Sequence, residues 1–159
     1  MSGDFLVRPL ASSRVQEAFP LVSVFHRDLS EDAWSEYAAA FVELPENGHG
    51  IMTVQSDAGY IHGLSAYHVK FELRRGAVLQ VENFVVMDLF GAKRVAKMLL
   101  HALEGVARSR HCHCMSLTLL DPRMRRWMRE TQRPAPDLFA AAGFRGEPLR
   151  LRKCFDEGA

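Results

Sequence analysis

A short segment between an expected strand and an expected helix combines small residues with positive charge. The small residues are Gly91, Ala92 and Ala96, and the basic ones are Lys93, Arg94 and Lys97. The first turn of a helix leaves backbone N–H groups unpaired, and the helix dipole adds to their attraction for anions. The segment is therefore suited to hold a phosphate group. An ordinary corner with a solvated basic turn has the same composition and stays the alternative.

Four residues of metal-binding types follow one another in His111-Cys112-His113-Cys114. On a strand, alternation would place the two histidines on one face and the two cysteines on the other. Two cysteines at this spacing, without a second pair of ligands, do not make a tetrahedral zinc site. We therefore expect no metal at this position.

A basic stretch follows over 123–133. Its arginines are Arg123, Arg125, Arg126, Arg129 and Arg133. A solvated helix face is the default interpretation of such a run, and contact with a bound phosphate group or an acidic partner is the alternative. A nucleic-acid partner is disfavoured because the net charge of the whole chain is only +1.

The elements that would position these residues are readable from periodicity and end signals. Phe5–Leu10 alternates apolar and polar residues as a strand does, and a helix capped by Ser12 or Ser13 follows, divided by Pro20. A second helix has Ser30 as its N-cap and extends to about Glu43.

The middle of the chain has the pattern of a sheet. Three strands separated by turn sequences predict an antiparallel meander over Ile51–Gln55, Tyr60–Leu73 and Ala77–Val86. A helix follows, with one apolar stripe from Val95 to Val106, and then a buried strand over Cys112–Leu120. A meander that passes into a β–α–β unit predicts an α/β domain with a mixed, mostly antiparallel sheet and helices on its faces.

The last third of the chain has clear breakers. Asp121-Pro122 opens an expected helix, a short helix over Asp137–Ala142 ends at Gly143, and Leu149–Phe155 is the last expected strand.

Length and composition limit the class of protein. With 159 residues, 48% hydrophobic and 25% charged, the chain suits one globular domain over 1–159. Three cysteines without framework spacing argue against a secreted disulfide scaffold. The N-terminus lacks the pattern of a signal peptide, and no apolar run reaches the length of a membrane span. We expect a soluble, cytoplasmic protein without membrane contact.

The strand and helix around the basic segment resemble the core motif of the GNAT superfamily of acetyl-CoA-dependent N-acetyltransferases. Val81-Glu82-Asn83-Phe84-Val85-Val86 matches the family's strand, and Lys97-Met98-Leu99-Leu100 matches the start of its helix. Leu138-Phe139-Ala140-Ala141-Ala142-Gly143-Phe144 is similar to the family's Leu-Tyr-x-x-x-Gly-Phe segment. Within the superfamily, this strand, the helix and the Cys112–Leu120 region resemble the diamine and polyamine acetyltransferases most.

The resemblance implies roles for particular residues. Glu82 would be the general base that deprotonates the amine, and Glu82 and Asn83 would lie beside this substrate. Asn83 faces away from Glu82 if the strand is regular, and a bulge would change that. The resemblance further assigns cofactor-binding residues: Phe84, Val85 and Val86 beside the pantetheine arm, and Gly91, Ala92, Lys93, Arg94, Val95, Ala96 and Lys97 around the pyrophosphate.

Three departures from the family pattern concern the chemistry. Gly91 stands where the loop usually has arginine or glutamine, and Arg94 stands at a usual glycine, where we expect its side chain to swing over the phosphates. Phe139 replaces the tyrosine that is the family's usual general acid. Tyr60, Tyr67 and Cys114 are the other candidates for that role.

The sequence thus predicts transfer of an acetyl group from acetyl-CoA to a small amine, without a metal. The alternatives are a GNAT-fold domain without catalysis that binds CoA or a protein, and a Glu82 that pairs with an arginine or points to solvent. The sequence leaves the acceptor amine and the oligomeric state, including a homodimer, open.

Overall fold

The structure, a computed structural model, describes residues 4–43, 47–87, 92–118 and 141–144. The chain divides into two units, Met1–Pro122 and Arg123–Ala159, each taken here by itself. In the second unit, Ala141 is helical and Gly143 has a φ of +93°, the left-handed conformation of a residue that ends a helix. The helix expected from Asp121, the arginines of 123–133 and the strand expected at Leu149–Phe155 lie outside the described residues.

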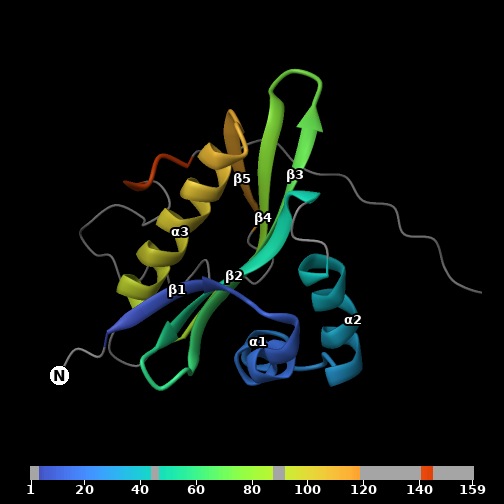
Figure 1. Cartoon of the computed structure of the whole chain (residues 1–159), viewed down its shortest axis with the longest axis vertical. Coiled ribbons are helices and arrows are strands. Elements are labelled where there is room, and N and C mark those ends of the chain that lie inside the picture. Colours follow the sequence, from blue (N-terminus) through green and yellow to red (C-terminus); the bar gives the residue numbers. More distant parts are fainter. Residues whose placement is uncertain (1–3, 44–46, 88–91, 119–140, 145–159) are drawn as a thin grey trace, which may run out of the picture. The chain divides into compact units, whose positions relative to one another are not determined.

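A mixed five-stranded sheet forms the centre of the first unit (Figure 1). The strands follow the chain in the order β1-β2-β3-β4-β5; their bounds are β1 Phe5–Pro9, β2 His49–Ser56, β3 Ile61–Glu72, β4 Gly76–Val86 and β5 Cys114–Thr118. The first four pair antiparallel, whereas β4 and β5 pair parallel. The parallel pair needs a crossover connection, which the helix between these strands supplies. The predicted meander and β–α–β unit are therefore confirmed.

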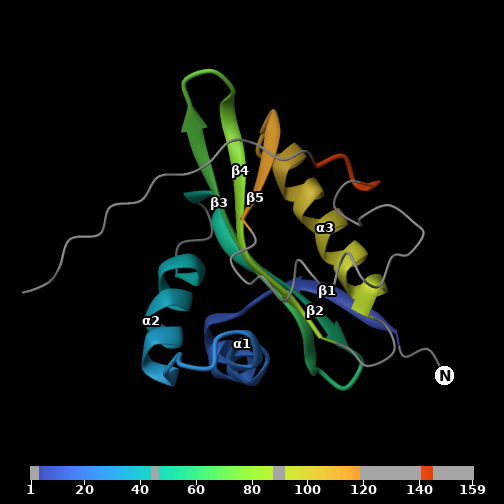
Figure 2. The same ribbon diagram turned by 180° about the vertical axis from the view of Figure 1, so that it is seen from behind.

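Helices cover both faces of this sheet (Figures 1 and 2). On one face lie the 3-10 helix η1 (Ser12–Ala18), α1 (Phe19–Phe25) and α2 (Glu31–Val42). Pro20 occupies the first turn of α1, where its missing N–H costs no hydrogen bond, so the predicted division of this helix is confirmed. Ser30 caps α2 as predicted, because its hydroxyl accepts a hydrogen bond from the Ala33 N–H at 3.1 Å.

The other face carries α3 (Ala92–Ser109). Val95, Leu99 and Leu103 of its apolar stripe are fully buried. The helix approaches β3 closely at Gly63, where an added Cβ would lie 2.7 Å from Cγ1 of Val95. The close approach explains why a residue without a side chain stands in this strand.

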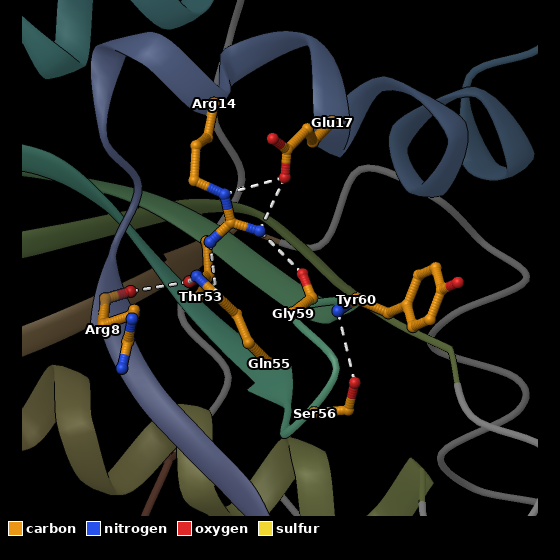
Figure 3. Close-up of polar contacts among 8 residues, drawn as sticks. All are labelled: Arg8, Arg14, Glu17, Thr53, Gln55, Ser56, Gly59 and Tyr60. Atoms are coloured by element: carbon orange, nitrogen blue, oxygen red, sulfur yellow. Dashed lines mark hydrogen bonds and ion pairs between the residues drawn. The ribbon is translucent and has the colours of Figure 1, made fainter.

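A partly buried polar network ties η1 to the hairpin between β2 and β3 (Figure 3). The Arg14 guanidinium donates to Gln55 Oε1 at 2.6 Å, to the Gly59 carbonyl at 2.7 Å and to Glu17 Oε2 at 2.8 Å. Gln55 in turn donates to the Thr53 hydroxyl at 2.8 Å. These bonds satisfy the buried side chains of Thr53 and Gln55, so the network fixes η1 and the chain leading into α1 on the sheet.

Two expectations about the segment after α3 were wrong. The strand begins at Cys114, not Cys112, and none of its five described residues is buried. His111 has a φ of +58° and belongs to the turn that leaves α3, so the four metal-type residues do not share one alternating strand. The apolar residues of this segment gave no sign that Cys112 and His113 precede the strand. Every helix within the described residues is too short or too polar to span a lipid bilayer.

Candidate active site

A β-bulge in β4 shapes the region around Glu82. On β3, Leu64 and Ala66 are two residues apart, whereas their partners Val85 and Glu82 are three apart on β4. The extra residue is accommodated by Asn83, whose φ of +53° is in the left-handed region. Asparagine is one of the few side-chain-bearing residues that adopt this region readily. The strand is therefore not regular at Asn83, and the bulge that would change the direction of its side chain is present.

The bulge turns Glu82 and Asn83 toward the same face of the sheet, the one that α2 covers. Glu82 Oε1 lies 3.8 Å from Nδ1 of His68 on β3, and the His68 ring is 6.2 Å from the ring of Phe41 on α2. Asn83 Nδ2 donates a hydrogen bond of 2.7 Å to Oη of Tyr37, also on α2. The side chains of Glu82 and His68 are 28% and 37% exposed. A partly exposed carboxylate beside an imidazole can exchange a proton with that ring and with water.

Tyr37 is a polar residue of this face, and the helical pattern from Ser30 to about Glu43 gave no sign of a role for it. Burial raises the pKa of its hydroxyl well above the ordinary value; the hydrogen bond from Asn83 lowers it, and the charge of Glu82 adds to the rise. The hydroxyl therefore keeps its proton at neutral pH, and it can donate that proton to a ligand while it accepts from Asn83.

A cavity of about 120 Å³ opens next to this hydrogen bond. Both Tyr37 and Asn83 line it, with Val85 from beyond the bulge and Trp34 from the preceding turn of α2. The Trp34 and Tyr37 rings stack with centroids 6.0 Å apart, and the Trp34 indole N–H donates to the Val15 carbonyl at 2.8 Å. A concave, mostly apolar space with a few convergent polar groups is the usual form of a small-molecule site.

The strand residues predicted to lie beside a cofactor arm continue from the bulge. Within the described residues, pairing of β4 with β5 ends at Glu82 and Thr118, and Phe84, Val85 and Val86 lie beyond that point. All three residues are buried, so a cofactor arm along this strand would meet their backbone, whereas Val85 also lines the cavity. Their role in cofactor binding stays a prediction.

The N-terminal end of α3 has the predicted charge. Lys93 and Arg94 lie in its first turn and Lys97 in its second; all three are exposed, and the first turn has no acidic residue. Val95 and Ala96 are fully buried, so their side chains belong to the core and only their amides could meet an anion. Of the two remaining predicted residues, Gly91 lies outside the described residues, and Ala92 is the first residue of α3.

Arg94 has a defined neighbour in this structure. Its guanidinium carbon lies 5.2 Å from the centre of the Phe5 ring on β1, a cation–π contact. The contact holds the side chain against β1 at the N-terminal end of α3. The expectation that Arg94 swings over a phosphate stays a prediction, and such a move would have to break this contact.

The candidates for a general acid are separated by the fold. Tyr60 is 72% exposed near the β2–β3 turn. Tyr67 follows Ala66, the residue that pairs with Glu82, and successive strand residues point to opposite faces, so Tyr67 faces the other side of the sheet. Burial raises the pKa of Tyr67, and the charge of Arg110 lowers it. Cys114 pairs with Val78, four residues before Glu82 on β4. Phe139 lies outside the described residues. Of the tyrosines, Tyr37 alone shares the cavity with Asn83.

No group of three His, Cys, Asp or Glu side chains within the described ranges is arranged to hold a metal ion. His111 lies in the turn described above, and His113 stands between Cys112 and the first residue of β5.

Comparison with known proteins gives a likeness in structure but not in sequence. No protein-family model matches the chain, and no curated protein sequence is significantly similar to it. The aminoglycoside N-acetyltransferase AAC(6')-Iy in complex with CoA superposes with a TM-score of 0.75 at 15% identity, covering 99% of this chain and 97% of that one.

Two other solved structures are similar over comparable lengths. Glucosamine-6-phosphate N-acetyltransferase from Arabidopsis thaliana gives a TM-score of 0.70 at 16% identity, with 96% of this chain and 99% of that chain covered. Ribosomal-protein-alanine N-acetyltransferase from Brucella melitensis biovar Abortus 2308 gives 0.69 at 18%, with 96% and 100% covered. The fold of this protein is that of the GNAT N-acetyltransferases.

Proposed function

We propose that this protein transfers the acetyl group of acetyl-CoA to a primary amine of a small molecule by direct attack of the amine. The observation that carries the proposal is the bulge at Asn83, which turns Glu82 and Asn83 to one face of β4 beside a cavity. The N-acetyltransferases whose structures superpose on this chain support the reaction class. Their different acceptors leave the substrate to be argued from this chain.

Acetyl-CoA, when bound, supplies the acetyl group as an activated thioester. An alkylamine is mostly protonated at neutral pH, so it must lose a proton before it can attack. Glu82 takes that proton, and His68, whose Nδ1 is 3.8 Å away and whose side chain is more exposed, passes it to water. The bond that forms joins the amine nitrogen to the acetyl carbon, and the bond that breaks releases the thiolate of CoA. The second proton that the nitrogen loses after the attack passes to this thiolate or to water. A thiol has a pKa of about 8.5, so its thiolate can leave without help from a strong acid.

The residues present fit an anionic cofactor. The first turn of α3 offers backbone N–H groups and two basic side chains, has no acidic residue, and is followed by Lys97 in the second turn. Lys93, Lys97 and, after release from Phe5, Arg94 would hold the pyrophosphate. Binding to the native state alone should raise the melting temperature with acetyl-CoA concentration. No shift at millimolar acetyl-CoA would contradict the cofactor assignment.

The role of Glu82 has a matched test. Glu82→Gln keeps the shape of the side chain but removes the base, so turnover should fall by roughly 10²–10⁴ with the acetyl-CoA-induced shift in melting temperature unchanged. Glu72→Gln is the control, because Glu72 lies on neighbouring β3 and pairs with Lys70 and Arg75 at its end. Turnover should be measured as release of free CoA thiol.

Turnover and the melting-temperature shift together separate the main proposal from its alternative. An unchanged rate in Glu82→Gln would transfer the role of base to water or to His68. A melting-temperature shift with acetyl-CoA, but no turnover of any amine by the wild-type protein, would favour a CoA-binding module without catalysis.

A further inference from the structure

The cavity beside Asn83 has walls that are almost entirely hydrocarbon. Val22 of α1, Leu29 before α2, Leu64 of β3 and Val85 of β4 contribute aliphatic side chains. Trp34 adds the face of its ring, and its indole N–H is already bonded to the carbonyl of Val15. A ligand in this space gains contact with apolar surface and finds few groups with which to form hydrogen bonds.

Charge complementarity separates the classes of acceptor. Among the described residues that line this cavity, none is an aspartate, glutamate, lysine or arginine. A second ammonium group placed here would lose its water without gaining a counter-ion, which is costly. Apart from the bonded indole N–H, the polar side chains at the wall are His26, Tyr37 and Asn83. The occupant of the cavity is therefore an uncharged group.

The volume of the cavity limits the size of that group. An engineered apolar cavity of roughly 150 Å³ takes up benzene. The space here is about 120 Å³, which is enough for one compact hydrocarbon group. The hydroxyl groups of a sugar ring would be left without partners against the aliphatic wall.

The polar end of the cavity lies toward the proposed base. Asn83 lines the cavity and directly follows Glu82 in the bulge, and the Glu82 charge acts on the Tyr37 hydroxyl. A nitrogen joined by a short link to a group inside the cavity would thus be presented near the carboxylate. Asn83 and Tyr37 can bond a polar atom along that link.

We infer that the acceptor is a small monoamine with one compact apolar group, an aromatic ring or a branched hydrocarbon, and that this group fills the cavity between α1, α2 and β4. The inference rests on the proposed acetyl transfer. It disfavours diamines and polyamines, which the sequence resemblance had suggested, as preferred acceptors.

The experiment compares binding and turnover of matched amines. Binding of 2-phenylethylamine, ethylamine and 1,4-diaminobutane is measured by titration calorimetry with CoA present, so that binding is read without chemistry. Since one methylene in an apolar pocket is worth roughly 10–200-fold, 2-phenylethylamine should bind at least tenfold more tightly than the other two. Acetyl transfer from acetyl-CoA to the same amines is followed separately by thiol release.

Two matched substitutions on α1 test the location. Val22→Phe fills the cavity, because Val22 is buried in its wall, whereas Val24→Phe adds the same ring at an exposed position of the same helix. Val22→Phe should weaken 2-phenylethylamine binding at least tenfold, and Val24→Phe should change it little. The melting temperature of each variant, and its rise with acetyl-CoA, show whether the variant is folded and still binds the cofactor.

The outcomes keep the two proposals apart. Tighter binding of 1,4-diaminobutane, or equal effects of Val22→Phe and Val24→Phe, would overturn the inference about the acceptor even if acetyl transfer is observed. Binding of 2-phenylethylamine that depends on Val22, without turnover of any amine, would support the cavity assignment and overturn the proposed transfer.

Discussion

The positive φ of Asn83 can be tested by the order of stability of two substitutions. At an ordinary strand position glycine is less stable than alanine by roughly 0.5–1 kcal/mol. At a φ of +53° the order should reverse, because the left-handed conformation costs an alanine roughly 1–2 kcal/mol, whereas glycine has no side chain to clash there. Both variants also lose the 2.7 Å hydrogen bond to Tyr37, worth about 0.5–1.5 kcal/mol.

These magnitudes predict a definite pattern in urea denaturation. Asn83→Gly should lower the free energy of unfolding by about 1 kcal/mol, and Asn83→Ala by about 2 kcal/mol. In a Tyr37→Phe background the hydrogen bond is already absent, so both losses should shrink while the difference between glycine and alanine persists. The persistent difference isolates the backbone from the side-chain bond.

One result would refute the reasoning. If Asn83→Ala is as stable as Asn83→Gly, or more stable, the residue does not need the left-handed conformation. The bulge would then be wrong, and with it the placement of Glu82 and Asn83 on one face.

Three further predictions concern other contacts. Gly63→Ala should lower unfolding free energy by about 1–3 kcal/mol in urea denaturation, because its Cβ would lie 2.7 Å from Val95 Cγ1; a Val95→Ala background should remove most of this loss, and no relief would contradict the contact. Burial raises the pKa of Tyr37, so its stabilising contribution is complete below about pH 10 and is lost as pH rises further. Tyr37→Phe should therefore lose less stability than the wild type between pH 10 and 12, by at most about 1.4 kcal/mol per pH unit, and parallel curves would argue against a buried hydroxyl. Arg94→Gly should weaken acetyl-CoA binding in calorimetry by about 1.5–3 kcal/mol, and unchanged affinity would mean that Arg94 stays on Phe5.

Local sequence determined most of the elements of the first unit. Ser30 begins α2 because a hydroxyl at that position satisfies an N–H of the first turn, and Pro20 divides the preceding helix because it lacks an N–H. The stripe of α3 is buried as predicted because helical spacing alone places Val95, Leu99 and Leu103 on one side. Each of these signals acts within a few residues of the chain, so no partner strand had to be known.

The arrangement of the candidate site was decided by tertiary structure. Nothing local to Asn83 requires a positive φ; the bulge exists because β4 must pair with β3 on both sides of an extra residue. Tyr37 was readable as part of the apolar side of a helix, but its partner Asn83 is 46 positions away, and only the packing of α2 on the sheet brings the two together. Likewise, Glu82 is recognisable as a carboxylate on a strand, whereas its neighbour His68 follows from the register of β3. The sequence thus determines which chemical groups the chain carries. The pairing of β3 with β4, and the packing of α2 on these strands, decided which of those groups share one face.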